Sequence, residues 1–302
     1  MKIMYVTSEC APFVKTGGLG DVAGSLPKAL AAKGHDVRVF CPLYSAIGQE
    51  WREKFYYLKN AYVRLGWRNQ YCGIFRYESD GVTFYFIDNE YYFARGQVYG
   101  EYDDAERFAY YSKAVLEVLP DLDWKPDVIN CNDWQTALVP VYYNLMFSSR
   151  PFYENIKTVF TIHNIQYQGK YGLDILEDTC GIGRRDAHIV EYDGCANFMK
   201  GAIETADKIT TVSPTYAQEI LDPWFSYGLD ALLREKQYKL CGILNGIDTE
   251  AKTLPPTPTS PSTTMSTTSK RARQSARRLC RISSASTRTA APSLQWSAAW
   301  SA

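Results

Sequence analysis

A glycine-rich loop between the first predicted strand and the first predicted helix constrains this chain most. Residues 15–21 read KTGGLGD and follow an apolar run over 2–9 that predicts a buried strand. Residues 22–33 then carry apolar side chains at helical spacing, and Gly34 closes the helix. The backbone N–H groups of such a loop can bind an anion at the helix N-terminus, and Lys15 adds a positive charge. The run therefore predicts an α/β domain with a site for a phosphate-bearing ligand.

The same loop fits the dinucleotide-binding fingerprint badly. Gly18 and Gly20 are followed by Gly24, one residue later than the usual spacing, and no acidic residue closes the second strand over 37–43. A nicotinamide enzyme is therefore disfavoured, and we expect no cofactor and no metal site. A glycine-rich loop alone is weak evidence, because the lysine of such a loop is commonly only solvated.

Short apolar runs alternate with segments of helical periodicity as far as residue 244. Strands are expected at 2–9, 37–43, 127–131, 157–162, 208–212 and 240–244, with helices at 22–33, 103–119, 136–147, 197–206, 228–235 and from Ser213-Pro214 onward. Pro27 leaves two starts open for the first helix, near Ser25 or at Asp21 with a kink. Three alternating runs, 61–67, 71–77 and 82–87, predict a small β-hairpin or meander insert. The expected fold is Rossmann-like, a mostly parallel sheet with helices on both faces.

The chain changes character after residue 250. Residues 1–250 hold 25 Lys and Arg against 33 Asp and Glu, whereas residues 251–302 hold eight basic residues and no acidic one. Twenty of those last 52 residues are Ser or Thr, and apolar periodicity is lost. We therefore expect a globular domain over 1–250 and a disordered tail over 251–302. A basic arm that binds an anionic partner is the alternative interpretation of the tail.

Composition also bears on partners and location. The mildly acidic globular part has no basic patch of the kind that binds nucleic acid. No apolar run reaches the length of a membrane span, and the N-terminus does not resemble a signal peptide. The eight cysteines form no Cys-x-x-Cys pair, and Cys41, Cys131 and Cys241 fall within strand candidates. Such thiols are typical of a reduced, cytoplasmic protein.

Polar residues follow several of the predicted strands. Asp133 comes after the strand over 127–131, His163 and Asn164 come after 157–162, and Asn245 comes after 240–244. Because ligands of open α/β sheets bind beyond the carboxyl ends of the strands, these residues and the glycine loop are expected to line one rim. Each also has a structural interpretation, since Asp133 can cap the next helix and His163 can hold a turn.

Six segments resemble bacterial glycogen synthase and plant starch synthase, in the order found in that family. They are KTGGLGDVAGSLPKAL (15–30), NDWQTAL (132–138), TIHNIQYQG (161–169), TVSPTYAQEI (211–220), YGLDALL (227–233) and GILNGID (242–248). The resemblance implies the N-terminal domain of a GT-B fold, in which two Rossmann-like domains face each other across a cleft. It also implies a retaining transfer of glucose from ADP-glucose to the non-reducing end of an α-1,4-glucan such as glycogen.

The resemblance further implies roles for single residues. Lys15 and Gly18 match the loop near the donor phosphates and sugar, and Asp21 matches a residue of the same cleft. His163 matches the histidine that hydrogen-bonds the transferred glucose, and we expect it to act with Asp133 as the catalytic pair. The remaining matches are Asn164 and Asn245 as cleft residues and an aromatic-Arg loop near the sugar with Phe93 and Arg95. Phe93 takes a slot that the family often fills with tyrosine, which puts a hydroxyl contact there in doubt.

Nothing after Glu250 resembles the family's second domain, which carries an Arg/Lys pair for the diphosphate, most of the nucleotide pocket and a glutamate facing the glucose. Because losing one preorganised donor costs about 2.7–4 kcal/mol, we expect a truncated chain that is inactive alone. The bias of the tail suggests a frameshifted translation, which reading the DNA in the other two frames would test. Two alternatives remain, a glucan-binding or regulatory module without catalysis and a GT-B transferase with another sugar donor.

Overall fold

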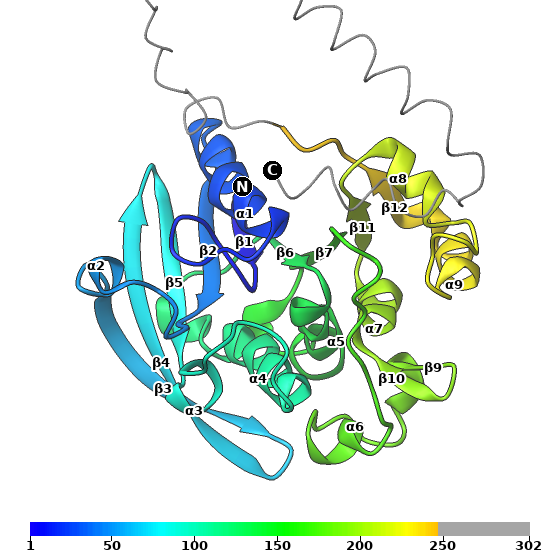
Figure 1. The fold of residues 1–302 in the computed structure, drawn as a ribbon. Helices are drawn as coiled ribbons and strands as arrows, with labels where there is room; N and C mark the ends of the chain where they lie inside the picture. The colour runs from blue at the N-terminus through cyan, green and yellow to red at the C-terminus, as the bar shows by residue number, and fades with distance from the viewer. Residues whose placement is uncertain (247–302) are drawn as a thin grey trace, which may run out of the picture. The chain divides into compact units, whose positions relative to one another are not determined.

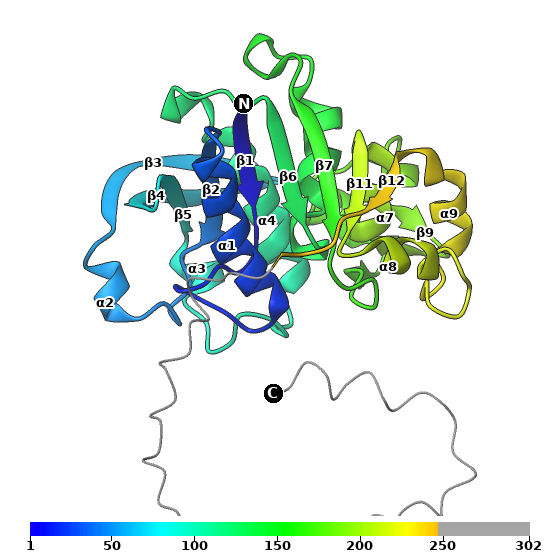
Figure 2. The same ribbon diagram turned by 90° about the horizontal axis from the view of Figure 1, so that it is seen from above.

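The computed structural model describes residues 1–246, so the expectations for residues 251–302 lie outside the described part of the chain. Within residues 1–246, twelve strands form two sheets (Figures 1 and 2). The large sheet has the order β12-β11-β7-β6-β1-β2-β5-β4-β3, and the small sheet has the order β8-β10-β9. The strands are β1 (Lys2–Val6), β2 (Asp36–Pro42), β3 (Tyr56–Leu65), β4 (Arg68–Ser79), β5 (Val82–Asp88), β6 (Val128–Asn132), β7 (Lys157–Ile162), β8 (Lys170–Tyr171), β9 (Glu191–Tyr192), β10 (Cys195–Asn197), β11 (Lys208–Thr211) and β12 (Leu240–Gly242).

Neighbouring strands of the large sheet run parallel from β12 to β5. Helices cover both faces, with α1 and α8 on one side and α4, α5 and α7 on the other (Figure 1). This double cover explains the continuous apolar runs of the central strands and confirms the predicted fold class. The helices are α1 (Gly18–Ala32), α2 (Gln49–Arg52), α3 (Glu90–Phe93), α4 (Asp104–Glu117), α5 (Leu138–Tyr142), α6 (Ile175–Asp178), α7 (Phe198–Thr205), α8 (Pro214–Glu219) and α9 (Asp230–Glu235).

Helix α4 packs against the sheet and against α5 and is buried along most of its length. Arg107, Tyr110 and Tyr111 of this helix are fully buried. The Tyr111 hydroxyl contacts the carbonyl oxygens of Thr7 and Phe40, at 2.9 and 2.7 Å. These two carbonyls lie at the carboxyl ends of β1 and β2, so α4 is anchored at the edge from which the candidate site residues emerge.

Most of the expected elements are present, with shifted ends. Strand β7 coincides with the expected run over 157–162. The Ser213 hydroxyl caps α8 by accepting the N–H of Tyr216 at 2.9 Å, as its position before Pro214 predicts. Helix α1 begins already at Gly18, so the glycine loop forms its first turn and Pro27 lies buried inside the helix.

The predicted meander is present as β3, β4 and β5, but it is not a separate insert. Strand β5 pairs in parallel with β2, and β4 and β3 continue the large sheet in antiparallel fashion. The sequence pattern did not predict this, because strand pairing depends on contacts between distant residues. The small sheet of β8, β10 and β9 was missed, since strands of two or three residues have no readable alternation.

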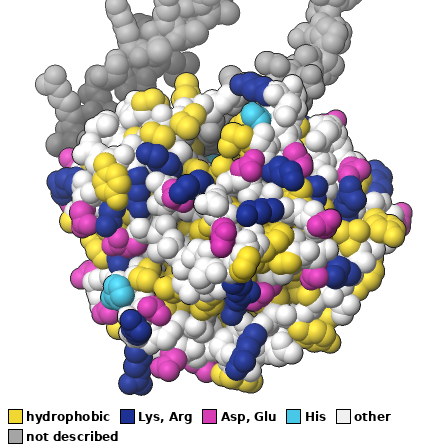
Figure 3. Space-filling view, turned by 180° about the vertical axis from the view of Figure 1, so that it is seen from behind, with side chains coloured by type: hydrophobic (Ala, Val, Ile, Leu, Met, Phe, Trp, Pro, Cys, Tyr) yellow, Lys and Arg dark blue, Asp and Glu magenta, His cyan; other side chains and the backbone are white. Residues whose placement is uncertain are grey.

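Cysteine positions are confirmed in part. Cys41 and Cys131 are buried free thiols, whereas Cys241 on the edge strand β12 is exposed. Every helix within residues 1–246 is too short or too polar to cross a lipid bilayer. On the face seen in Figure 3, basic and acidic side chains are interspersed across the described surface instead of gathering into a basic patch.

The turn between β3 and β4 packs against α6 through Gly66. Gly66 has a φ of 57°, and a Cβ added there would lie 2.2 Å from the carbonyl oxygen of Asp178. The neighbouring Trp67 Nε1 donates to the Asp178 carboxylate at 2.8 Å, and Arg68 Nη1 donates to the Asp178 carbonyl at 2.8 Å. The meander and α6, far apart in sequence, are therefore held together at this turn.

We predict that Gly66→Ala destabilises the fold more than Gly34→Ala. Both glycines have positive φ, which costs an alanine about 1–2 kcal/mol, but Gly34 has no atom within 4 Å of the added Cβ. Chemical denaturation of the two variants measures the difference in free energy of unfolding. Equal losses would mean that the turn does not pack on α6.

Candidate active site

Parallel pairing brings the loops that follow β1, β6, β7 and β12 to one edge of the sheet. Because β6 lies between β1 and β7, the loop after β6 has the other two as neighbours. Two hollows among the described residues lie at the opposite, amino edge, one lined by Lys2, Asp36 and Asp127 and the other by Lys157, Asp207 and Lys239. Neither of these two hollows contains a residue predicted for the site. Since Lys15, Gly18, Asn164 and Asn245 are exposed, the candidate site lies on an open edge of the described domain.

Asp133 follows β6 in a strained backbone conformation. Its φ is 56° and its ψ is −179°, a region that glycine occupies and other residues avoid at a cost of about 1–3 kcal/mol. Its N–H donates to the carbonyl of Thr161 at 3.0 Å. Its Oδ1 accepts the backbone N–H groups of His163 at 2.7 Å and of Asn164 at 3.3 Å. The Asp133 carboxylate thus ties the loop after β6 to the loop after β7.

The His163 ring is oriented by Asn132, the last residue of β6. Asn132 Nδ2 donates to the carbonyl of Val6 at 2.9 Å, which fixes the amide so that Oδ1 is the acceptor. This Oδ1 accepts the Tyr5 hydroxyl at 3.1 Å and lies 3.0 Å from His163 Nε2. His163 Nε2 therefore donates to this oxygen, and in the neutral ring Nδ1 is the nitrogen left to accept from a ligand.

Glu9 is buried beneath the glycine loop and hydrogen-bonds its backbone. The sequence pattern did not predict this supporting role. Its side chain is 2% exposed. One carboxylate oxygen accepts the N–H and the hydroxyl of Thr16 at 2.6 and 2.5 Å, and the other accepts the N–H of Gly20 at 3.0 Å. In the sequence, the signal for this role is an acidic residue shortly after the first strand, followed by a Thr-Gly-Gly run. Glu9 fixes the conformation of the loop that was predicted to face phosphate.

The predicted loop residues lie on the exposed side of this support. Gly18 is the first residue of α1, and its N–H has no acceptor within residues 1–246, as expected for a first helical turn. Lys15 Nζ pairs with the Asp21 carboxylate at 2.8 Å, and both side chains are half exposed. Lys15 and Asp21 therefore neutralise each other here, although such a solvent-exposed pair is weak.

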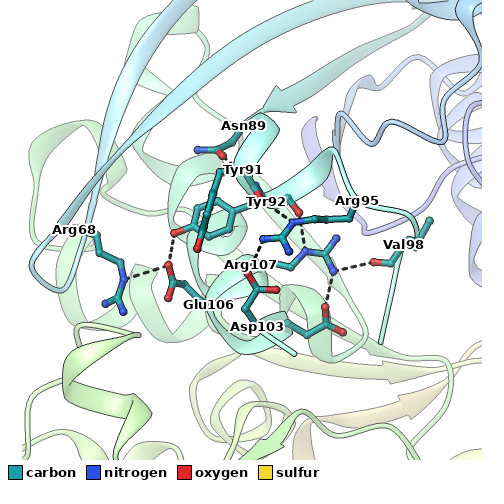
Figure 4. Close-up of polar contacts among 10 residues, drawn as sticks. Arg68, Asn89, Tyr91, Tyr92, Arg95, Val98, Asp103, Glu106 and Arg107 are labelled. Carbon is teal, nitrogen blue, oxygen red and sulfur yellow. Dashed lines mark hydrogen bonds and ion pairs between the residues drawn. The ribbon is translucent and has the colours of Figure 1, made fainter. Parts of the chain in front are cut away.

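Phe93 and Arg95 are placed differently from the expectation, and Figure 4 shows Arg95 turned toward Asp103 of its own loop. The Phe93 side chain is fully buried and meets the Tyr44 ring edge-to-face at 5.5 Å, so it cannot contact a sugar. An apolar ring at this slot packs inward because the core of α4 lies beneath it. Arg95 donates to the Asp103 carboxylate at 2.8 Å and to the Tyr91 carbonyl at 2.7 Å. It therefore links the two ends of its own loop and does not point toward the site residues.

That loop, residues 93–103, reaches the site through a different residue, Tyr99. Arg107 donates to the carbonyls of Tyr92 at 2.7 Å and Val98 at 3.4 Å and pairs with Asp104 (Figure 4). The Tyr99 hydroxyl, one residue beyond Val98, hydrogen-bonds Ser8 at 2.7 Å, next to Glu9. Tyr99 was not predicted, because only the tertiary structure brings residues 8 and 99 together.

Asn164 and Asn245 are both exposed. The Asn164 side chain accepts the N–H of Gln166 at 3.0 Å, which turns the loop away from β7. After β12 the chain continues with the N–H of Ile243 donating to Thr211 at 2.8 Å and then runs back toward α1 (Figures 1 and 2). Asp133, His163 and Asn164 therefore lie in direct contact, while Asn245 approaches from the far end of the same edge. No group of three His, Cys, Asp or Glu side chains within residues 1–246 is arranged to hold a metal ion.

We predict that Glu9→Gln loosens the glycine loop. The amide keeps one acceptor oxygen but presents an NH₂ group to N–H donors, which costs about 1–3 kcal/mol for a buried group left unsatisfied. Tryptic cleavage after Lys15 should become faster, and the free energy of unfolding should fall. Glu154→Gln, at an exposed site, is the control and should change neither. Unchanged cleavage after Lys15 would show that Glu9 does not hold the loop.

We also predict a pH-dependent stability from Asp133. Burial raises the pKa of its carboxyl above 3.8, while the charge of His163 and the N–H groups of His163 and Asn164 oppose the rise. Since the folded state holds the proton more tightly than the unfolded state, stability falls as pH rises from 3.8 through the raised pKa. Asp133→Asn keeps the Oδ1 acceptor and should remove this dependence in urea denaturation across acidic pH, unlike Asp21→Asn. The idea fails if wild type and Asp133→Asn give parallel profiles.

Comparisons with known proteins agree with this architecture. Residues 2–235 match the family described as "Starch synthase catalytic domain". The glycogen synthase of Clostridium botulinum (strain Eklund 17B / Type B) is 54% identical over 251 residues, covering 82% of this chain and 52% of that protein. The glycogen synthase of Geobacillus thermodenitrificans (strain NG80-2) is 51% identical over 252 residues, covering 83% of this chain and 52% of that protein.

A solved structure is also similar. The catalytic domain of Starch Synthase IV from Arabidopsis thaliana, bound to ADP and acarbose, superposes with a TM-score of 0.76 at 34% identity. The match covers 83% of this chain and 52% of that chain. The chain thus spans about half the length of the curated relatives it matches. With a family match over most of its described residues and relatives above 50% identity, this chain belongs to the starch synthase catalytic domain family.

Proposed function

We propose that this chain supplies the N-terminal half of a glycogen (starch) synthase that transfers glucose from ADP-glucose to the non-reducing end of an α-1,4-glucan. The observation that carries the proposal is the strained Asp133, whose carboxylate holds the His163 loop at the carboxyl edge beside the glycine loop. Backbone strain of this kind concentrates at functional sites. The similarity to glycogen synthases supports the choice of reaction.

In this proposal His163 contacts the glucose unit directly. Its Nε2 is held by Asn132, so its Nδ1 and ring edge face a ligand in one orientation. Asp133 acts through the backbone of residues 163 and 164 and sets where the histidine lies. A positioned hydrogen-bond partner stabilises the reacting sugar without reorganising during the step.

The glycine loop would receive the donor phosphates. The N–H of Gly18 points from the first turn of α1, where the helix dipole favours an anion. Lys15 would exchange its weak pair with Asp21 for a phosphate oxygen, and the half-exposed geometry makes this exchange inexpensive. Asn245 would contact the sugar of the donor at the same edge. The free cysteines fit the reducing cytoplasm as the place of action.

Residues 1–250 are proposed as one starch synthase-type domain, consistent with a compact unit over Met1–Asp248. Because the candidate residues lie on an open edge, transfer needs groups that face them from outside the described part. We therefore expect this chain alone to incorporate labelled glucose from ADP-glucose into glycogen far more slowly than a full-length relative does. Turnover at such a rate would overturn this expectation.

We predict that His163→Ala weakens the binding of acarbose, a ligand named with the similar starch synthase structure. Loss of one hydrogen bond to a positioned ring corresponds to about a tenfold higher Kd in isothermal titration calorimetry. His188→Ala is the matched control, because His188 is exposed and the one hydrogen bond that its ring makes within residues 1–246 is to the nearby Arg185 carbonyl. Equal binding by the two variants would remove His163 from the proposed site.

The same titration separates the second candidate, a glucan-binding module without catalysis. Exposed aromatic residues such as Tyr167, Trp224 and Tyr227 on loops of the described domain favour it. A module of this kind binds acarbose without any effect of ADP. The synthase proposal predicts that ADP at the glycine loop changes acarbose affinity, because the two ligands occupy adjacent parts of one edge.

A further inference from the structure

The loop after β7, residues 163–169, has a buried amide near its end. Gln168 is polar but only 3% exposed. Its Nε2 donates to the carbonyl of Ile165 and to the carbonyl of Tyr227, both at 3.1 Å. Its Oε1 accepts the Nδ2 of Asn197 at 2.7 Å. Each N–H group of the amide therefore has an acceptor, and this one side chain joins three separate parts of the described domain.

Asn197 sets the orientation of the Gln168 amide. Asn197 is fully buried and caps α7, because its Oδ1 accepts the N–H of Lys200 at 3.0 Å. This cap leaves the Asn197 Nδ2 as a donor, so the Gln168 atom that it meets is the acceptor Oε1. The Nε2 of Gln168 then faces the two carbonyls. The cap of α7 thus determines which way the amide points.

The carbonyl of Tyr227 is a fixed partner for this amide. Tyr227 has a φ of 52°, a conformation that a bulky residue seldom adopts. The hydroxyl of Ser226, a fully buried residue, donates to the Asp230 carboxylate at 3.1 Å and accepts the N–H of Gly228 at 3.2 Å. The Tyr192 hydroxyl donates to the Gly228 carbonyl at 3.1 Å. Because these contacts hold the backbone on both sides of Tyr227, its strained conformation persists and its carbonyl stays in one place.

The contact with Ile165 acts two residues from His163. Ile165 is buried, and its N–H donates to the Tyr216 hydroxyl of α8 at 3.1 Å. Its carbonyl is one of the two acceptors of Gln168. Both backbone hydrogen-bonding groups of Ile165 are therefore fixed, one by α8 and the other by Gln168.

The loop is thus held at both ends. At its start the Asp133 carboxylate accepts the N–H groups of residues 163 and 164. At its end Gly169, the residue after Gln168, lies against Trp134, and a Cβ added there would be 2.6 Å from the Trp134 ring. Packing on Trp134 and the hydrogen bonds of Gln168 together fix the end of the loop.

We infer that Gln168 is a positioning residue for His163. The inference rests on the proposed function, in which His163 contacts the glucose unit. Because Gln168 is buried, it does not touch the ligand and acts through the backbone of residues 165–168. A loop that is already fixed loses less conformational freedom when a ligand binds, so the amide contributes to affinity.

The histidine rings give a direct readout of this position. The chain has three histidines, His35, His163 and His188. Their ring Cε1–H signals in an NMR spectrum are therefore few, and the His163→Ala variant identifies the signal of His163. Gln168→Met keeps the length of the side chain but removes its N–H donors and its carbonyl acceptor. We expect the His163 signal to shift or split in this variant, while that of His35, just before β2 at the opposite edge of the sheet, stays unchanged.

Thr158→Val is the matched control. Thr158 is buried at the amino end of β7, where its hydroxyl donates to the Asp207 carboxylate at 3.1 Å. Its loss should lower the free energy of unfolding without moving the His163 signal, since the loop lies at the other end of the strand. If the His163 signal of folded Gln168→Met also stays in its wild-type place, Gln168 serves stability alone and the inference is wrong. Gln168→Asn, whose amide is too short to reach all three partners, is measured in the same way if Gln168→Met does not fold.

Acarbose binding measures whether the effect of Gln168 passes through His163. We expect Gln168→Met to raise the Kd in isothermal titration calorimetry about tenfold, as His163→Ala does. The double variant should bind no more weakly than His163→Ala alone, because the ring that Gln168 positions is then missing. Losses that add in the double variant would overturn the inference.

The two measurements separate this inference from the proposed function. If His163→Ala leaves the Kd unchanged, the proposed contact with the sugar fails, and the NMR signal alone decides whether Gln168 positions the ring. If His163→Ala weakens binding and Gln168→Met does not, the proposed function stands and the inference is overturned.

Discussion

Parallel pairing of β1, β6 and β7 is the constraint on which the candidate site depends. Each strand ends at the same edge, so residues 9, 133 and 163 emerge as neighbours although more than a hundred positions separate the first from the others. The Asp133 carboxylate then fixes the position of the next loop relative to its own, because it accepts two N–H groups from that loop. The strain at Asp133 persists because these bonds and the Thr161 contact hold the backbone in place.

Buried polar groups give the edge its rigidity. Glu9 holds the glycine loop through three hydrogen bonds, and Asn132 orients the His163 ring through one. Arg107 holds the carbonyls of Tyr92 and Val98, at the start of the 93–103 loop and within it. None needs to touch a ligand to matter. Because the groups they hold are ordered before a ligand arrives, less ordering cost falls on binding. The described domain therefore presents a preorganised carboxyl edge.

The side chains at the carboxyl edge determine which ligands it suits. At the edge, backbone N–H groups, a lysine and a histidine would suit a phosphate-bearing ligand, and the Lys15–Asp21 pair keeps the loop neutral in the described structure.

The sequence by itself determined the alternation of strands and helices, the glycine loop, the cap at Ser213 and the polar residues at strand ends, because each depends on local spacing or on one residue's backbone preference. It also carried the family motifs, and the comparisons confirm that family. It could not place Phe93, whose burial depends on the core around α4, or show that β5 joins β2. The contacts of Glu9 and Tyr99 emerged only from the tertiary structure, because Glu9 bonds the folded glycine loop and the partner of Tyr99, Ser8, lies far along the chain.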